Sequence, residues 1–359
     1  MSLRELRRRA GRLAIVGFSG ESVPVELREI ISTFDLGGVI YFPRNLSEPR
    51  QVRELSREVA SLADAWPFWI SVDQEGGRVA RLRQPFTEWP PMATLGRSGD
   101  ETLARRCARA LAAELQAVGI NLDYAPVLDV HTNPKNPVIG DRALSERPDE
   151  VARLGAAMIH ALQDGGVAAC GKHFPGHGDT GTDSHHELPV VEHGPDRLHA
   201  IELAPFRAAI AADVASIMTA HVLLPALDAS QPATFSPAVI DGLLKRTLGF
   251  RGVVISDDLG MKAVADAGLE EAFVRALAAG CDAALLCNVS ADEQVSAIES
   301  VIRAGESGRL SATRLDDAFE RQERVKDRFR PRAARVAAGL DVIGCAEHQA
   351  VAREMEQWR

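Results

Sequence analysis

The amino-acid sequence predicts a (β/α)8 barrel, a closed ring of eight parallel strands surrounded by helices. Short apolar runs recur along the 359 residues, and each is followed by polar residues and a helix-like segment. The runs are continuous rather than alternating, which is typical of strands buried on both faces of a parallel sheet. Eight strand–helix alternations close a barrel, and a chain of this length commonly forms one barrel domain. The runs span residues 13–18, 38–42, 68–73, 120–127, 166–173, 216–221, 252–257 and 282–288.

The segments between these runs predict the outer helices. Their apolar residues recur at helical spacing, and one of them ends before Gly280, a typical helix stop. Pro126 has no N–H to donate to a sheet, so the fourth strand is expected to end or bend there. The clearest helical segments are 101–117, 149–163, 195–212 and 270–279.

Pro331 is expected to end the last helix of the barrel. The sequence therefore predicts a catalytic barrel at residues 1–330 and a helical C-terminal tail at residues 331–359. The tail either covers the floor of the barrel or forms a contact between subunits. A doubly wound open sheet is the alternative fold, but GFSGESVP after the first strand lacks the G-x-G-x-x-G pattern of a nucleotide-binding loop.

Composition narrows the range of partners. The net charge is −9 with both signs interspersed, so no basic surface for nucleic acid is predicted. The five cysteines show no paired spacing and lie mostly in apolar context, as expected for buried free thiols in a reducing compartment. The apolar run after the basic N-terminus is too short for a signal peptide, and no stretch approaches a membrane span. We therefore expect a cytoplasmic protein without a membrane partner, either a monomer or a weak homo-oligomer.

Polar side chains follow the predicted strands at the point where each strand ends. In a barrel of this kind the chemistry takes place at the carboxyl ends of the strands. Charged groups at buried strand ends are costly unless they are paired or used. The residues at these positions are Asp73, Lys172, His173, His221, Asp257, Asp258 and Asn288.

Residues 172–189 read KHFPGHGDTGTDSHHELP and hold four of the ten histidines, three glycines and two prolines. This density of turn residues indicates a loop, and catalytic groups concentrate in loops on rigid scaffolds. In one interpretation His173, His177 and His185 bind a metal ion, since imidazole is the commonest metal ligand. In the other, His185 is an acid/base oriented by Asp183, which lies two residues earlier on the same side of an extended segment.

Asp257 and Asp258 end the seventh run. Asp258 fits the N-cap of the helix expected near Leu259, which leaves Asp257 to face the mouth of the barrel. A retaining glycosidase uses such a carboxylate as its nucleophile, while a second group protonates the leaving oxygen and later activates water. A histidine suits the second role, because its ordinary pKa of roughly 6.5 lies near working pH.

Asp73 begins a second polar segment, DQEGGR at residues 73–78. Its glycines permit close approach of the backbone to a ligand, but the helix-opening GK[ST] pattern of a phosphate loop is absent. Binding two sugar hydroxyls is the better use of the Asp73 carboxylate. Arg142 follows a loop rich in asparagine and proline, and its neighbourhood makes it a second candidate for the site.

Four motifs together resemble glycoside hydrolase family 3, in its single-domain branch of bacterial β-N-acetylglucosaminidases. The segment KHFPGHGDTGTDSH is long and specific, and VDQEGGRV, IGDR and ISDDLGM occur in the family's order. The resemblance runs from about residue 10 to about residue 330. It implies a (β/α)8 barrel and a retaining mechanism, and we predict no cofactor and no metal. Two-domain members place a carboxylate acid/base outside the barrel, and we expect no room for that second domain in this chain.

By motif match, the resemblance implies that Asp257 is the nucleophile and that His185, paired with Asp183, is the acid/base. In Gram-negative members the substrate is a cell-wall recycling fragment, N-acetylglucosamine linked to anhydro-muramic acid and its peptides. The partner implied for this chain is thus a small carbohydrate or muropeptide. The positions that match sugar-binding residues are Asp73, Arg81, Arg142, Lys172 and His173, with Met261 lining the site.

The chain departs from many relatives at Ala143-Leu144, where they carry Ser-Phe, and at Gly260, where they carry a polar residue. Neither position is the implied acid or nucleophile. A metal-dependent barrel hydrolase that uses the three histidines of residues 172–189 is the alternative function. A non-catalytic sugar-binding relative would be expected to lack one of the three implied catalytic residues, and all are present.

Overall fold

A computed structural model of the chain, which describes residues 3–63, 66–184, 187–329 and 339–359, confirms the predicted barrel. The strands form a closed ring in the order β1-β10-β9-β8-β7-β6-β3-β2, and every neighbouring pair is parallel. Each predicted apolar run contributes one strand. The strands are β1 (Ala14–Val16), β2 (Gly38–Tyr41), β3 (Trp69–Val72), β6 (Leu122–Asp123), β7 (Ala168–Phe174), β8 (Ser216–Thr219), β9 (Val253–Asp258) and β10 (Ala283–Leu286).

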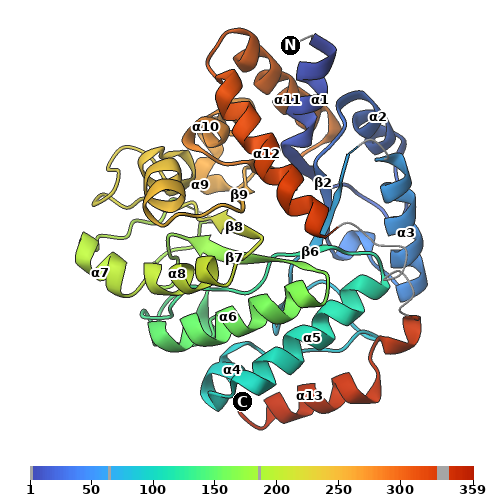
Figure 1. The fold of residues 1–359 in the computed structure, drawn as a ribbon, viewed down its shortest axis with the longest axis vertical. Coiled ribbons are helices and arrows are strands. Elements are labelled where there is room, and N and C mark those ends of the chain that lie inside the picture. The colour runs from blue at the N-terminus through green and yellow to red at the C-terminus, as the bar shows by residue number, and fades with distance from the viewer. Residues whose placement is uncertain (1–2, 64–65, 185–186, 330–338) are drawn as a thin grey trace.

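Helices surround the ring of strands (Figure 1). A two-stranded hairpin, β4 (Gln74–Gly76) and β5 (Val79–Ala80), follows β3, and short turns of helix lie at η1 (Pro43–Asn45), η2 (Gly140–Arg142), η3 (Ala233–Phe235) and η5 (Leu340–Val342). The longer helices are α1 (Leu3–Arg12), α2 (Val25–Phe34), α3 (Pro49–Leu62), α4 (Ala93–Ser98), α5 (Glu101–Ala117), α6 (Pro148–Asp164), α7 (Pro195–Ala200), α8 (Leu203–Ala211), η4 (Ala238–Thr247), α9 (Lys262–Ala265), α10 (Leu269–Ala279), α11 (Ala291–Glu306), α12 (Ala312–Arg328) and α13 (Ala346–Glu356).

The interior of the barrel is filled by alternate residues of the strands. Trp69 on β3, Ala168 and Cys170 on β7, and Val253 and Ile255 on β9 belong to one buried cluster. Because side chains alternate with a period of two, the same face continues to position 73 after β3, to 172 on β7 and to 257 on β9. The alternation that builds the core therefore also directs these three polar side chains toward the mouth of the barrel.

One predicted helix is broken. Residues 195–212 form α7 and α8 rather than a single helix, with the break at Ile201 and Glu202. A proline inside a continuous helix lacks an N–H and clashes with the carbonyl four residues earlier, whereas the first turn tolerates it. The new helix starts at Leu203 and places Pro205 in its first turn. The fourth strand likewise ends at Asp123, before Pro126, as predicted.

The described part of the C-terminal tail, residues 339–359, lies against the outer helices and not beneath the barrel. Helix α13 packs on α5 and α4 (Figure 1). Glu114 on α5 accepts hydrogen bonds from the Gly344 N–H at 3.0 Å and from His348 Nδ1 at 2.8 Å. The barrel floor is instead closed by α12, since Val325 and Phe329 join the interior cluster. The floor of the barrel, which the tail was one candidate to cover, is thus covered by α12. Pro331, which was expected to end that helix, lies outside the described residues.

Two further expectations concern the cysteines and membranes. All five cysteines are free thiols and four of them are buried, as predicted. Among the described residues, no helix has both the length and the apolar character needed to cross a membrane.

Candidate active site

A cavity of about 510 Å³ opens at the carboxyl ends of the barrel strands. This volume lies within the range of small-ligand sites, and the position is where barrel enzymes carry out chemistry. Strand-end residues from several strands line it together, although His221, which the sequence analysis grouped with them, does not. The predicted residues that line the cavity are Asp73, Arg81, Arg142, Lys172, His173, Asp183, Asp257, Asp258, Met261 and Asn288.

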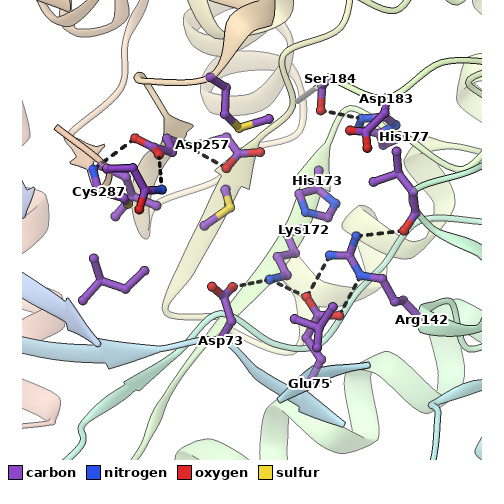
Figure 2. A pocket seen from close by; sticks show the side chains of 18 of the residues that line it. Asp73, Glu75, Arg142, Lys172, His173, His177, Asp183, Ser184, Asp257 and Cys287 are labelled. Atoms are coloured by element: carbon purple, nitrogen blue, oxygen red, sulfur yellow. Dashed lines mark hydrogen bonds and ion pairs between the residues drawn. The ribbon is translucent and has the colours of Figure 1, made fainter. Parts of the chain in front are cut away.

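Lys172 and Arg142 hold a buried cluster of ion pairs on one side of the cavity (Figure 2). The Lys172 ammonium lies 2.7 Å from Asp73 Oδ1 and 2.6 Å from Glu75 Oε1. Arg142 binds both oxygens of Glu75 in a bidentate pair, at 2.9 and 2.8 Å. Burial alone would raise the pKa of Glu75, but Arg142 and Lys172 outweigh it and hold that pKa well below its usual range. Glu75 is therefore ionised and fixes the directions of both cations.

Arg81 completes this cluster from the other side of Asp73. Its Nη2 lies 3.2 Å from Asp73 Oδ2, and its guanidinium stands over the ring of Phe42. Burial opposes ionisation of Asp73, but the charges of Lys172 and Arg81 lower its pKa below the ordinary value. Each carboxylate oxygen has a cationic partner and still offers lone pairs to a ligand hydroxyl. The predicted role of Asp73 as an acceptor for hydroxyl groups is therefore compatible with its geometry.

His173 is oriented by a carboxylate that the sequence analysis did not identify. Its Nδ1 lies 2.7 Å from Asp129 Oδ2, and both residues are buried. Asp129 also accepts a hydrogen bond from the His177 backbone N–H at 2.7 Å. Burial would raise the pKa of Asp129, but His173 and these hydrogen bonds lower it. An ionised Asp129 keeps a proton on His173 Nδ1 and so fixes the tautomer of that ring.

Asp257 differs from the other carboxylates of the cavity. Its Oδ1 accepts a hydrogen bond from the Asp258 backbone N–H at 2.8 Å. Within the described part of the chain, no lysine or arginine forms an ion pair with Asp257, whereas Asp73 and Glu75 are both neutralised in this way. Figure 2 shows Asp257 across the cavity from the Lys172 cluster. Among the described residues, the Asp257 carboxylate therefore has no lysine or arginine partner, which leaves its second oxygen available for attack on a substrate.

Asp258 and His221 support the end of β9 in ways that the sequence did not predict. Asp258 does not cap a helix near Leu259, since α9 begins at Lys262; its carboxylate accepts from the N–H groups of Gly260 and Cys287, each at 3.1 Å. His221 is fully buried and places Nε2 3.0 Å from the Asp258 carbonyl oxygen. Both side chains therefore form hydrogen bonds with the backbone next to Asp257 and fix its position.

The histidine-rich loop brings Asp183 and Ser184 to the cavity. His185, the predicted acid/base, and His186 lie outside the described residues. Asp179 is not among the residues that line the cavity, and it contacts Thr132 Oγ1 at 2.6 Å, His193 and Arg197. These contacts outweigh the effect of burial and lower the pKa of Asp179, so this residue is a poor proton donor.

The predicted alternative, a metal site of three histidines, finds no geometric support in the described residues. His177 places Nδ1 2.7 Å from Thr180 Oγ1 and Nε2 3.1 Å from Ser184 Oγ, so both ring nitrogens face hydroxyl groups. His173 uses Nδ1 for Asp129. The described ranges contain no group of three or more His, Cys, Asp or Glu side chains arranged to hold a metal ion.

The two departures from the family pattern lie in different environments. Ala143 and Leu144 are buried, with 2% and 1% of their surfaces exposed, beyond the residues that line the cavity. Gly260 lines the cavity beside Met261. The second departure therefore borders the site and the first does not.

Comparisons with known proteins identify the family of the chain. Residues 5–325 match the family model described as the glycosyl hydrolase family 3 N terminal domain. A beta-hexosaminidase of Thiobacillus denitrificans is 45% identical over 260 residues, which cover 70% of this chain and 72% of that protein. A beta-hexosaminidase A of Pseudoalteromonas piscicida is 35% identical over 363 residues, which cover 93% of this chain and 60% of that protein.

Two solved structures have the same fold. The structure of a glycoside hydrolase family 3 beta-N-acetylglucosaminidase from Paenibacillus sp. str. FPU-7 has a TM-score of 0.94 and 43% identity, covering 98% of this chain and 68% of that chain. NagZ from Neisseria gonorrhoeae, in complex with N-trifluoroacetyl-D-glucosamine, has a TM-score of 0.78 and 32% identity, covering 96% and 97%. The chain therefore belongs to glycosyl hydrolase family 3 and is a glycoside hydrolase with beta-hexosaminidases among its relatives.

Proposed function

We propose that the protein is a retaining β-N-acetylglucosaminidase that removes terminal N-acetylglucosamine from peptidoglycan-derived fragments. The observation that carries this proposal is the asymmetry of the cavity. One side is a fixed cluster of charges around Lys172, and the other side presents the Asp257 carboxylate without a cationic partner among the described residues. The names of the relatives, and the N-trifluoroacetyl-D-glucosamine bound to NagZ, support the identity of the sugar.

In the first chemical step, Asp257 attacks the anomeric carbon and the bond to the leaving group breaks. His185 donates a proton to the departing oxygen, and Asp183 stabilises the imidazolium before transfer. In the second step the neutral imidazole takes a proton from water, and that water displaces Asp257 from the sugar. Two inversions at one carbon retain the β configuration. Asp183 lines the same cavity as Asp257, which supports this pairing of roles.

The sugar is held by groups whose positions are fixed before it arrives. Lys172 is 2% exposed and is bound between two carboxylates, so little side-chain entropy remains to be lost on binding. Asp73 offers oxygen lone pairs to sugar hydroxyls, while Lys172, Arg142 and His173 offer donors. Met261 borders the site with an apolar surface.

Hydrolysis of an aryl β-N-acetylglucosaminide tests the proposal, with the matching aryl β-glucoside as the control. The proposed enzyme should release the phenol from the first compound with retention at the anomeric carbon, observed directly by NMR. The glucoside should be a poor substrate. Equal turnover of both compounds, or an α product, would refute the proposed specificity or mechanism.

The natural leaving group is proposed to be anhydro-muramic acid with or without its peptide, in the cytoplasm. The resemblance to cell-wall recycling enzymes supports this part of the proposal. Release of N-acetylglucosamine from an isolated muropeptide carrying anhydro-muramic acid, measured by mass spectrometry, tests it. Activity on aryl substrates without activity on the muropeptide would support the proposed mechanism and refute the proposed natural substrate.

Removing the charge of Lys172 should weaken turnover. Lys172→Met keeps most of the length of the side chain but removes charge-assisted hydrogen bonds that contribute roughly 1.5–3 kcal/mol, so kcat/KM should fall about ten- to a hundredfold. Arg105→Ala, which breaks an exposed ion pair with Glu101 on α5, is the control and should keep wild-type kinetics. Thermal unfolding of both variants separates loss of binding from loss of fold. Wild-type kinetics in Lys172→Met would show that the sugar site has been misplaced.

Metal removal should leave activity unchanged. The proposed chemistry uses an organic acid/base pair, so exhaustive dialysis against a chelator should not alter kcat or KM. The measurement is made before and after dialysis, with zinc and manganese added back to separate samples. Loss of activity that either metal restores would favour the metal-dependent hydrolase instead.

A further inference from the structure

The loop that carries Asp183 is fastened to the barrel where it begins. The His177 N–H donates to Asp129 at 2.7 Å, and Asn136 Nδ2 donates to the His177 carbonyl oxygen at 2.8 Å. Gly178 lies so close to the neighbouring segment that an added Cβ would stand 1.9 Å from the Val130 carbonyl oxygen. The backbone at residues 177–178 is therefore held at one place relative to the barrel.

The His177 side chain extends this anchorage along the loop. The ring is buried and makes hydrogen bonds with Thr180 and Ser184, at 2.7 and 3.1 Å. Burial lowers the pKa of His177 to about 4, so the ring is neutral near pH 7. A neutral imidazole has one N–H and one acceptor nitrogen, and a hydroxyl serves either one. Both hydrogen bonds therefore persist in either tautomer of the ring.

Ser184 is held from two sides. Its hydroxyl contacts His177 Nε2 (Figure 2), and its carbonyl oxygen accepts from the Ala263 N–H at 3.3 Å, at the start of α9. The residue is 2% exposed. In the sequence Ser184 stands between Asp183 and His185. It therefore connects the proposed acid/base segment both to the first part of the loop and to the wall that contains Met261.

We propose that His177 and Ser184 are positioning residues, and that the hydrogen bond between them sets the distance of the acid/base segment from Asp257. The proposal rests on the proposed roles of Asp183 and His185. Proton transfer requires heavy atoms roughly 2.6–3.2 Å apart, and a misplacement of about 1 Å costs about a hundredfold in rate. A bond that acts at this point affects the chemical step without touching the substrate.

Ser184→Ala tests the proposal because it removes the hydroxyl and leaves the backbone contact with Ala263 in place. For substrates with poor leaving groups, such as the phenyl glycoside, kcat/KM should fall about tenfold or more, because their departure depends on a well-placed acid. For the dinitrophenyl glycoside kcat/KM should stay within about twofold, because its leaving group needs no proton. A merely destabilised protein would lose the same fraction of activity on both substrates, and that outcome would overturn the proposal.

His177→Phe removes the same hydrogen bond from the ring side and keeps a flat buried side chain. If both residues act through their shared bond, the double variant should be no worse than the more affected single variant. Fully multiplicative losses would show independent roles and refute the proposed link. The matched control is Ser216→Ala, which removes a buried hydroxyl that donates to the Ala169 carbonyl oxygen at 3.2 Å inside the barrel. It should leave the ratio of the two substrates unchanged.

His185→Ala measured on the same two substrates separates this proposal from the proposed function. If His185→Ala discriminates strongly between leaving groups and Ser184→Ala does not, the acid/base assignment stands and the positioning role fails. If neither variant discriminates, the acid/base assignment itself has failed. Discrimination by both, weaker in Ser184→Ala, is the expected result.

Discussion

Asp257→Ala is expected to lower kcat/KM by about 10⁵-fold or more on every β-N-acetylglucosaminide, because the variant lacks the group that forms the glycosyl-enzyme. Both proposed steps involve this carboxylate. A better leaving group therefore cannot restore turnover, and the dinitrophenyl glycoside should be affected as severely as the phenyl glycoside. Initial rates across a series of aryl leaving groups measure this directly.

The product formed with added azide identifies what Asp257 does. In the alanine variant, azide has room to attack the anomeric carbon from the vacated side, which gives the α-glycosyl azide by a single inversion. Asp258→Asn is the neighbouring control. Asp258 accepts backbone hydrogen bonds from Gly260 and Cys287, so this variant should lower kcat/KM far less than Asp257→Ala does. Substantial dinitrophenyl turnover by Asp257→Ala without azide would refute the assignment of the nucleophile.

The barrel was predictable because its strands are buried on both faces. A strand buried on both faces is apolar at every position, so a continuous apolar run indicates it directly. All eight runs form strands of the ring. Local breaks were harder to predict. The break between α7 and α8 depends on a single residue, Pro205, within a segment that otherwise has helical periodicity.

The site was predictable where a polar residue directly continues a buried strand. Asp73, Lys172 and Asp257 follow this rule, and all three line the cavity. His221 satisfies the same rule but is buried behind the Asp258 backbone, because a strand-end position does not determine which face of the sheet a side chain joins.

Two carboxylates were missed for different reasons. Glu75 lies in the short hairpin after β3, and its partners Arg142 and Lys172 are 67 and 97 positions away, so its role depends on tertiary contacts. Asp129 follows the fourth apolar run by two positions. Pro126 makes the end of that strand irregular, so the position of Asp129 relative to the strand end is not evident from the sequence. The sequence therefore identifies the polar residues at strand ends more readily than the carboxylates that orient those residues through tertiary contacts.

His185→Ala is expected to affect substrates unequally, in contrast to Asp257→Ala. The variant loses proton transfer, which contributes about 10²–10⁴-fold when the leaving group is a strong base such as a sugar alkoxide. A dinitrophenolate departs without a proton, so formation of the glycosyl-enzyme should survive with this substrate. Hydrolysis of that intermediate still needs a base, and the intermediate should therefore accumulate and appear as a burst of phenol.

Azide should then restore turnover of the dinitrophenyl glycoside in His185→Ala, because azide attacks the glycosyl-enzyme without general-base assistance. The product should be the β-glycosyl azide, since two inversions precede its release, whereas Asp257→Ala should give the α anomer. The anomer is determined by the coupling constant of the anomeric proton in the NMR spectrum. If His185→Ala slows the turnover of substrates with good and poor leaving groups alike and azide has no effect, His185 binds the substrate or supports the structure and does not transfer protons. Glu187 would then be the next candidate on the loop, because Asp179 contacts Thr132 and Arg197 and is not among the residues that line the cavity.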